Sequence, residues 1–373
     1  MQKKYTSLGL MSGTSGDGVD ASIINSNGID QFEVIKDKYF EYDSKIYSTI
    51  HYLKEKIFNF KDLKKLSKEL LELEKKITFF HAKVVKEFEF INEDILVGFH
   101  GQTIYHNGIE KISRQLGDGK LLHQLTKKKI IFDFRKNDIA NGGEGAPLAP
   151  IYHQLIATQN NILLPVCFLN IGGISNITIV SNSVGSTEIF SKDLGPGNCL
   201  IDTWVRKNSN KKFDMNGGMA LSGKKNEIIF EQAKQLYDNR INKKKLTFDT
   251  NDFDISFARG LSLEDGVATI TDLTASIISE EISTSVLKLK KNIKNILVCG
   301  GGRKNKVLLN KIKEYLPTEV NLILIDDHKI NGDFVESQAF AFLAIRSLLK
   351  LPISFPETTG CLRPSTGGEI VEN

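Results

Sequence analysis

Hydroxyls and glycines that could bind a phosphate are concentrated between residues 12 and 20. The stretch Ser12-Gly-Thr-Ser-Gly-Asp-Gly-Val-Asp20 offers backbone N–H groups and three hydroxyls without a bulky side chain before Val19. That combination suits an anion approached closely by backbone, although an ordinary polar hairpin turn would have the same composition. Gly13 and Gly18 have Walker spacing, but Val19 and Asp20 stand where Lys and Ser or Thr belong, so a P-loop is excluded.

Two more glycine turns follow apolar stretches later in the chain. Residues 165–171 lead into Gly172-Gly-Ile-Ser-Asn176, and residues 295–299 lead into Gly300-Gly-Gly302. The last turn, with Asn305, misses the dinucleotide fingerprint in its final position. Three turns that each offer backbone donors could close on one nucleotide.

Polar side chains stand where apolar strands would end and open onto a site. His100 and Gln102 follow one such apolar run, and Arg135 and Asp138 follow the next. The accompanying Gln102 and His106 favour a functional role for His100, and the alternative is a histidine with a structural partner at a strand end.

A carboxylate precedes a predicted helix start in Asp193-Leu-Gly-Pro-Gly-Asn198. Pro196 and Gly197 would expose the first N–H groups of that helix, which form an anion site. From the residues alone, Asp193 is either a helix-capping carboxylate or a group that does chemistry.

The elements expected to position these groups are strands and helices in an α/β order. Apolar periodicity predicts a hairpin over 8–24, strands near 31–42, 95–102, 129–134, 165–171, 177–180, 295–299 and 321–325, and helices from Ser44, over 66–84, from 200, near 225–238, over 263–289, from 305 and over 335–349. The glycine-rich segment 141–147 is predicted to be a hinge between two domains.

Bulk composition narrows the functional class. The 373 residues are 40% apolar and 25% charged with a net charge of +4, which gives no case for nucleic-acid binding. The lysines at 243–245 are interpreted as a solvated turn. Four scattered cysteines form no metal or redox motif, and no long apolar run suggests a membrane segment. We therefore expect a cytoplasmic globular protein.

Seven motifs taken together resemble those of the anhydro-N-acetylmuramic acid kinase family, within the actin, hexokinase and sugar-kinase superfamily. They are Gly9-Leu-Met-Ser-Gly-Thr-Ser-Gly-Asp-Gly-Val-Asp20, Phe99-His-Gly-Gln-Thr103, the segment 132–148, Asn170-Ile-Gly-Gly-Ile-Ser-Asn176, Asp193-x-Gly-Pro-Gly-Asn198, Val298-Cys-Gly-Gly-Gly302 and Phe334-Val-Glu-Ser-Gln-Ala-Phe-Ala341. They occur in the family's order and extend over nearly the whole chain.

The resemblance implies a two-lobed actin-like ATPase fold of the α/β class with a central interlobe cleft. The expected lobes are 1–134 with 337–373, and 135–336. The implied reaction uses ATP, Mg²⁺ and water to convert 1,6-anhydro-N-acetylmuramic acid into N-acetylmuramic acid 6-phosphate. A homodimer is also implied. The alternatives are a kinase for another amino sugar and a non-catalytic nucleotide-binding member of the superfamily.

The resemblance also assigns roles by residue. Asp193 would be the base that deprotonates water. The predicted ATP-binding residues are Gly13, Thr14, Ser15, Gly16, Asp17, Gly18, Val19, Asp20, Gly172, Gly173, Asn176, Gly300, Gly301 and Gly302. The predicted sugar-binding residues are His100, Gln102, Arg135, Asp138 and Glu336. Asp17 and Asp20 could hold Mg²⁺ through water, but the metal ligands are not determined.

Three positions depart from the family's pattern. Gly16 stands where Leu is usual, and Lys192-Asp-Leu194 replaces Phe-Asp-Thr. The Pro-Lys-Ser-Thr-Gly-Arg segment is not recognisable around residues 243–250. The last departure makes a local substrate or hinge contact doubtful.

Overall fold

The computed structural model describes residues 3–88, 95–182, 188–240 and 246–372, so the lysine cluster at 243–245 lies outside the described residues. The chain forms two compact units. Unit 1 comprises Met1–Ile162, Asn182–Ser191 and Asp333–Asn373, and unit 2 comprises Leu163–Ser181 and Lys192–Gly332. The predicted α/β class is confirmed. The cleft predicted between two lobes stays a prediction.

Unit 1 is built on a mixed sheet with the order β12-β6-β4-β1-β2-β3, to which β5 adds by pairing with β4. Its strands are β1 (Tyr5–Ser12), β2 (Gly18–Ser26), β3 (Phe32–Glu41), β4 (Leu96–Asn107), β5 (Ile112–Leu116), β6 (Lys129–Phe132) and β12 (Glu369–Val371). Its helices are α1 (Ser44–Lys54), α2 (Phe60–Lys65), α3 (Ser67–Lys86), α4 (Gly119–Thr126), α5 (Lys136–Ala140), α6 (Pro150–Gln159), α12 (Val335–Leu348) and α13 (Pro356–Thr359).

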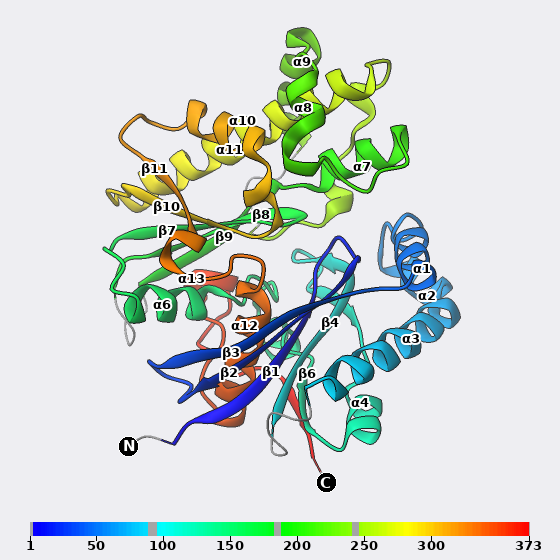
Figure 1. Ribbon diagram of the computed structural model, residues 1–373, viewed down its shortest axis with the longest axis vertical. Helices are drawn as coiled ribbons and strands as arrows, with labels where there is room; N and C mark the ends of the chain where they lie inside the picture. The colour runs from blue at the N-terminus through cyan, green and yellow to red at the C-terminus, as the bar shows by residue number, and fades with distance from the viewer. Residues whose placement is uncertain (1–2, 89–94, 183–187, 241–245, 373) are drawn as a thin grey trace. The chain divides into compact units, whose positions relative to one another are not determined.

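The two faces of this sheet are covered by different helices because side chains alternate along each strand. On one face, Leu8 and Leu10 belong to a core cluster that includes apolar residues of α1 and α3. On the other face, α12 approaches so closely that a Cβ at Gly9 would lie 1.9 Å from the Ser337 carbonyl oxygen. Figure 1 shows α3 and α12 with these strands between them.

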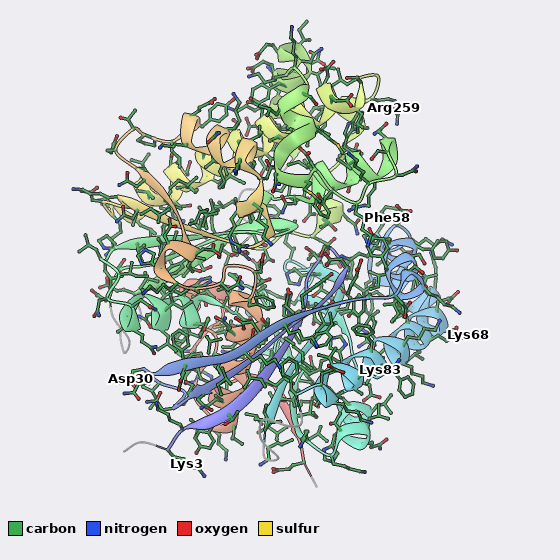
Figure 2. The ribbon with its side chains drawn as sticks, in the orientation of Figure 1. Lys3, Asp30, Phe58, Lys68, Lys83 and Arg259 are labelled. Carbon is green, nitrogen blue, oxygen red and sulfur yellow. The ribbon has the colours of Figure 1, made fainter. Side chains whose placement is uncertain are left out.

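The outer surface of α3 is mostly charged, as its amphipathic pattern predicts, although Leu71 and Phe79 are also exposed there. Lys68 and Lys83 are exposed and labelled in Figure 2, whereas Leu73 and Ile77 of the same helix are fully buried. The helix α1 begins at Ser44, where the sequence predicted its start, and its N-cap is Asp43, whose side chain accepts from the N–H groups of Lys45 and Ile46.

Unit 2 contains a second sheet with the order β11-β10-β7-β8-β9. Its strands are β7 (Val166–Ile171), β8 (Ile174–Val180), β9 (Ile189–Pro196), β10 (Asn295–Cys299) and β11 (Asn321–Leu324). Its helices are α7 (Cys199–Asn208), α8 (Gly218–Ser222), α9 (Glu227–Arg240), α10 (Leu263–Leu289) and α11 (Lys306–Tyr315), with short 3₁₀ turns at Met215–Gly217, Thr250–Asp252, Ser256–Ala258, Gly301–Lys304 and Ile325–His328. The long α10 packs against the other four helices.

The limits of unit 1 differ from the predicted lobe boundary at 134/135. Residues 135–162 cluster with unit 1. The ring of Tyr152 in α6 lies 5.2 Å from that of Phe32 and 5.7 Å from that of Phe342 in α12. These buried aromatic contacts attach α6 to the first sheet. The chain therefore passes into unit 2 at 162/163, about one helix later than predicted.

Candidate active site

The glycine turn between β1 and β2 is compact and supported from below. The Gly16 N–H donates to the Gly13 carbonyl at 3.1 Å. Gly16 has a φ of +64°, and a Cβ there would lie 2.8 Å from a methyl of Ile50. Lys54 donates its Nζ hydrogen to the Thr14 carbonyl at 2.7 Å. A larger residue at 16 would therefore strain the turn for two reasons: the positive φ is unfavourable for a residue with a Cβ, and the Cβ would be too close to Ile50.

Gln102 of β4 braces this turn from within unit 1. Its Nε2 donates to the Gly13 carbonyl at 2.8 Å, and its Oε1 lies 2.7 Å from the Ser12 hydroxyl. Its side chain is fully buried. The structure thus places Gln102, predicted to contact sugar, behind the turn, where its amide supports the backbone.

The end of the turn carries negative charge. The Ser15 hydroxyl donates to Asp17 at 2.5 Å. Burial raises the pKa of the nearby Tyr39 phenol, and the charges of Asp17, Glu41 and Asp20 raise it further. Val19, also predicted to bind ATP, has a fully buried side chain in the core. Within the described residues, no group of three or more His, Cys, Asp or Glu side chains could hold a metal ion.

His100 lies at a bulge in β4. Two consecutive residues of β1 pair with Phe99 and Gly101, so His100 is the extra residue between them. Gly101 has a φ of +76°, and a bulge of this kind redirects a side chain. The buried His100 ring packs on Phe340, with ring centroids 4.4 Å apart. β4 continues to Asn107, beyond the end predicted near residue 102, because β5 returns to pair with it.

Arg135 and His100 are in direct contact. Arg135 donates from Nη2 to His100 Nε2 at 3.1 Å. Because a guanidinium is always a donor, the ring proton resides on Nδ1, which donates to the Gly101 carbonyl at 2.9 Å. Burial, and then the positive charge of Arg135, hold the pKa of His100 well below its usual value. His100 is therefore a neutral acceptor for Arg135.

Asp138 holds a loop. Its Oδ1 accepts from the Thr359 hydroxyl at 2.6 Å, and its Oδ2 accepts from the Gly145 N–H at 2.7 Å. A Cβ at Gly143 would lie 2.1 Å from the same carboxylate. Both oxygens are thus engaged inside unit 1. The predicted hinge at 141–147 lies within that unit and does not join the two units.

Glu336 lies in the first turn of α12 and is partly exposed. A carboxylate is favoured there by the helix dipole. The next residues fix the turn: the Ser337 hydroxyl lies 2.6 Å from that of Ser22, and Gln338 donates to Asp37 at 3.0 Å.

In unit 2, Asp193 lies in β9 and is 8% exposed. Its Oδ2 accepts from the Phe248 N–H at 2.8 Å, and its own N–H donates to the Leu246 carbonyl at 2.8 Å. The adjacent Lys192 forms a largely buried ion pair with Glu281 of α10 at 2.6 Å. The strand end that carries the carboxylate is therefore fixed on two sides.

The turn of Gly172 and Gly173 contacts the start of α7. The Asn198 N–H donates to the Gly172 carbonyl at 2.8 Å, and the Gly197 N–H donates to the Gly173 carbonyl at 2.9 Å. A Cβ at Gly197 would lie 2.3 Å from the Gly172 oxygen. The prediction that Gly197 opens its amide to an anion is therefore wrong, because the neighbouring turn already accepts that hydrogen bond.

The third glycine turn packs on the end of β7. Gly300 has a φ of +79°, and a Cβ there would lie 2.3 Å from Asn170 Oδ1. A Cβ at Gly302 would lie 2.2 Å from Ile171. Asn176 pairs with Asn170 across the β7–β8 ladder and is partly exposed. β7 thus brings the two glycine turns of unit 2 together.

Two residues that the sequence analysis missed hold this third turn. Arg303 donates to both carboxylate oxygens of Asp326, at 2.7 and 3.0 Å, and from Nη1 to the Gly300 carbonyl at 3.2 Å. The Arg303 side chain holds the pKa of Asp326 below its usual value. The position of Arg303 directly after the glycines was the one available signal in the sequence.

The chain is similar to known proteins over nearly its full length. A family model described as "Anhydro-N-acetylmuramic acid kinase" matches residues 5–373. The anhydro-N-acetylmuramic acid kinase of Pelagibacter ubique (strain HTCC1062) is 55% identical over 376 residues, covering 100% of both chains. That of Agrobacterium fabrum (strain C58 / ATCC 33970) is 34% identical over 388 residues, again covering 100% of both.

A solved structure shows a weaker likeness. The activator of the 2-hydroxyisocaproyl-CoA dehydratase from Clostridium difficile with bound ADPNP has a TM-score of 0.42 and 12% identity, and the match covers 91% of this chain and 94% of that one. In the part of the chain that the structure describes, no helix has the length and apolar character needed to cross a membrane.

Proposed function

The chain belongs to the anhydro-N-acetylmuramic acid kinase family, and from this premise we propose how its residues divide the work of the reaction. The enzyme opens 1,6-anhydro-N-acetylmuramic acid and phosphorylates its 6-oxygen with ATP, a step of cell-wall recycling. The observation that carries this function is the 55% identity, over the whole chain, to a protein of that name.

The reaction needs one base and one electrophile. The C1–O6 bond of the sugar breaks while a water oxygen bonds to C1. The released O6 bonds to the γ-phosphorus as the bond to the ADP oxygen breaks, and the water proton passes to the base. An ordinary inverting glycosidase also needs an acid for the leaving oxygen, but here the phosphoryl group captures it.

Asp193 is the base in this proposal. Its support is the match to the family motif and the two backbone hydrogen bonds that fix its strand end. Base catalysis of this kind is worth about 10²–10⁴-fold, so alignment of water, sugar and phosphate must supply most of the acceleration.

Backbone amides of the three glycine turns bind the nucleotide. The support is their compactness, since the glycines at 16 in the first turn and 300 in the third allow approaches that any Cβ would prevent. Gln102 and Arg303 hold the first and third turns, and we assign them positioning roles.

Mg²⁺ is part of the proposal. Mg²⁺ keeps several waters and is usually bound by one or two carboxylates together with substrate phosphates. Asp17 and Asp20 would hold the ion through water, because these two carboxylates lie at the end of the turn proposed to bind the phosphates. When bound, the ion would neutralise phosphate charge.

Arg135 binds the lactyl carboxylate of the sugar, since a guanidinium pairs with a carboxylate through two parallel hydrogen bonds. His100 orients it as a neutral acceptor. Glu336 remains a proposed sugar ligand, whereas Asp138 holds the 142–145 loop.

One assay tests the function: ADP release with 1,6-anhydro-N-acetylmuramic acid, with N-acetylmuramic acid, and without sugar. We expect release with the anhydro sugar alone. Release with N-acetylmuramic acid would indicate a kinase for another sugar, and no release would indicate a non-catalytic member. We further infer that the enzyme is a cytoplasmic homodimer, which light scattering and cell fractionation test.

A further inference from the structure

The hydroxyl of Ser113 in β5 contacts three side chains, one of which is Arg135. Arg135 donates from Nη1 to Ser113 Oγ at 3.3 Å, and Gln115 donates from Nε2 to the same oxygen at 2.8 Å. His106 Nδ1 lies 3.0 Å from it. None of the motifs in the sequence contains Ser113.

The hydrogen bonds of this hydroxyl are fully determined. A serine hydroxyl has one hydrogen and two acceptor positions. Arg135 and Gln115 can act only as donors toward it, so they occupy both acceptor positions. The Ser113 hydrogen must therefore point to His106 Nδ1, which places the ring proton of His106 on Nε2. His100, on the other side of Arg135, carries its proton on Nδ1.

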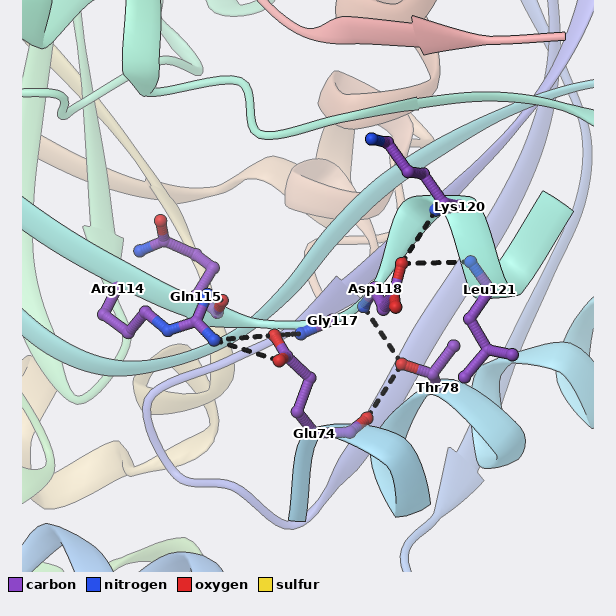
Figure 3. A network of polar contacts seen from close by, with 8 residues as sticks. All are labelled: Glu74, Thr78, Arg114, Gln115, Gly117, Asp118, Lys120 and Leu121. Carbon is purple, nitrogen blue, oxygen red and sulfur yellow. Dashed lines mark hydrogen bonds and ion pairs between the residues drawn. The ribbon is translucent and has the colours of Figure 1, made fainter. Parts of the chain in front are cut away.

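The strand that carries Ser113 is anchored through its other face. Arg114, which points the opposite way, donates to both oxygens of Glu74 at 2.9 and 3.0 Å, and Glu74 also accepts from the Gly117 N–H at 3.0 Å. Figure 3 shows this clamp together with the bond from the Asp118 N–H to Thr78. The register of β5 on β4, in which Ser113 lies opposite His106, is thereby maintained.

We propose that Ser113 is a positioning residue that sets the plane of the Arg135 guanidinium for the carboxylate of the sugar. With one Nη group bonded to His100 and the other to Ser113, the guanidinium cannot rotate about its long axis. A hydroxyl is the small group that can accept from Arg135 and Gln115 while donating to His106. Selection of a carboxylate-bearing sugar thus depends on a residue that does not touch the sugar.

This inference rests on the proposed role of Arg135, so the test is a double-mutant cycle. The variants are Ser113→Ala, Arg135→Ala and the double variant, with KM for the anhydro sugar and for ATP measured in each. Because hydrogen bonds to charged groups contribute strongly to binding, Arg135→Ala should raise the sugar KM about 100-fold. Ser113→Ala should raise it about tenfold and leave the ATP KM within about twofold. In the Arg135→Ala background, Ser113→Ala should add less than about twofold.

Two controls separate positioning from general damage. Ser113→Thr keeps the hydroxyl and should restore the wild-type sugar KM. Ser48→Ala removes another hydroxyl of unit 1, which bonds locally within α1, and should change neither KM. For variants that turn over too slowly, calorimetry gives the dissociation constant of the sugar.

The outcomes are distinguishable. If Arg135→Ala raises both KM values equally, the proposed role of Arg135 fails. If Arg135→Ala acts selectively but Ser113→Ala does not, or if Ser113→Ala has the same effect in both backgrounds, the positioning role of Ser113 fails. Nitrogen-15 spectra give a readout without activity: His106 should carry its proton on Nε2 in the wild type, and Ser113→Ala should weaken that preference. A wild-type Nδ1–H form of His106 would overturn the proposal.

Discussion

The backbone N–H of Phe248 donates to Oδ2 of Asp193 at 2.8 Å. The Asp193 N–H also donates to the Leu246 carbonyl at 2.8 Å, so two hydrogen bonds join Asp193 to the segment 246–248. This segment lies within the region, around residues 243–250, where the family's Pro-Lys-Ser-Thr-Gly-Arg sequence is not recognisable. The local sequence has changed, but backbone donors do not depend on side-chain identity.

Replacing Asp193 by Asn should remove the base while preserving shape. We expect kcat for sugar-dependent ADP formation to fall at least about 100-fold, with ATP affinity unchanged within about twofold. Asp238→Asn, on the exposed side of α9 in the same unit, is the matched control and should retain activity. Retention of more than a few per cent of wild-type kcat in Asp193→Asn would exclude this residue as the base.

Replacing Phe248 by Pro removes the N–H that holds the carboxylate, since proline has no backbone donor. We expect kcat to fall about tenfold or more, because a small misplacement of a catalytic group is costly. Phe248→Leu keeps the N–H and loses the ring contact with Phe253, so it should retain most of kcat. Equal losses in the two variants would mean that the ring, and not the hydrogen bond, matters.

Replacing Gln102 by Leu leaves the Gly13 carbonyl and the Ser12 hydroxyl without their amide partner. Loss of a buried partner costs about 1–3 kcal/mol, so we expect a lower Tm and a several-fold higher ATP KM. Gln102→Glu should act similarly, because a carboxylate cannot donate to Gly13. A selective rise in the sugar KM would instead support the contact with sugar that the sequence predicted.

The Arg303–Asp326 pair predicts a pH dependence of stability. Arg303 lowers the pKa of Asp326 in the folded state, relative to about 3.9 when unfolded. The ionised Asp326 therefore stabilises the folded state above about pH 4, and this stabilisation is lost as the pH falls through the lower pKa of the folded state. Asp326→Asn should reduce the free energy of unfolding at pH 6 more than at pH 3, as measured in urea.

The neighbouring Asp327→Asn is the matched control, since Asp327 is exposed and should show little change at either pH. A deficit of equal size at pH 6 and pH 3 in Asp326→Asn would contradict an ionic contribution from this pair.

The glycine turns and most of the apolar strands were predictable from sequence because they depend on local chemistry, whereas β9, the strand that carries Asp193, was not predicted. Glycines that follow an apolar strand predict a turn wherever they lie in the chain. Local sequence also predicted that α7 begins just after residue 198. It could not show that the carbonyls of Gly172 and Gly173 accept hydrogen bonds from the first N–H groups of this helix. That contact joins residues about 25 positions apart along the chain.

Only the tertiary structure determined which polar side chains hold neighbouring segments in place and which are left exposed to solvent. Gln102 and Asp138 have side chains of the kind that bind sugars, but pairing of β4 with β1 and packing of α13 engage them inside unit 1. Ser113 and Arg303 carry no motif, yet strand register and a bidentate ion pair make them neighbours of the groups they position. Residue type sets what a side chain can bind, whereas distant backbone pairing determines which partner it meets.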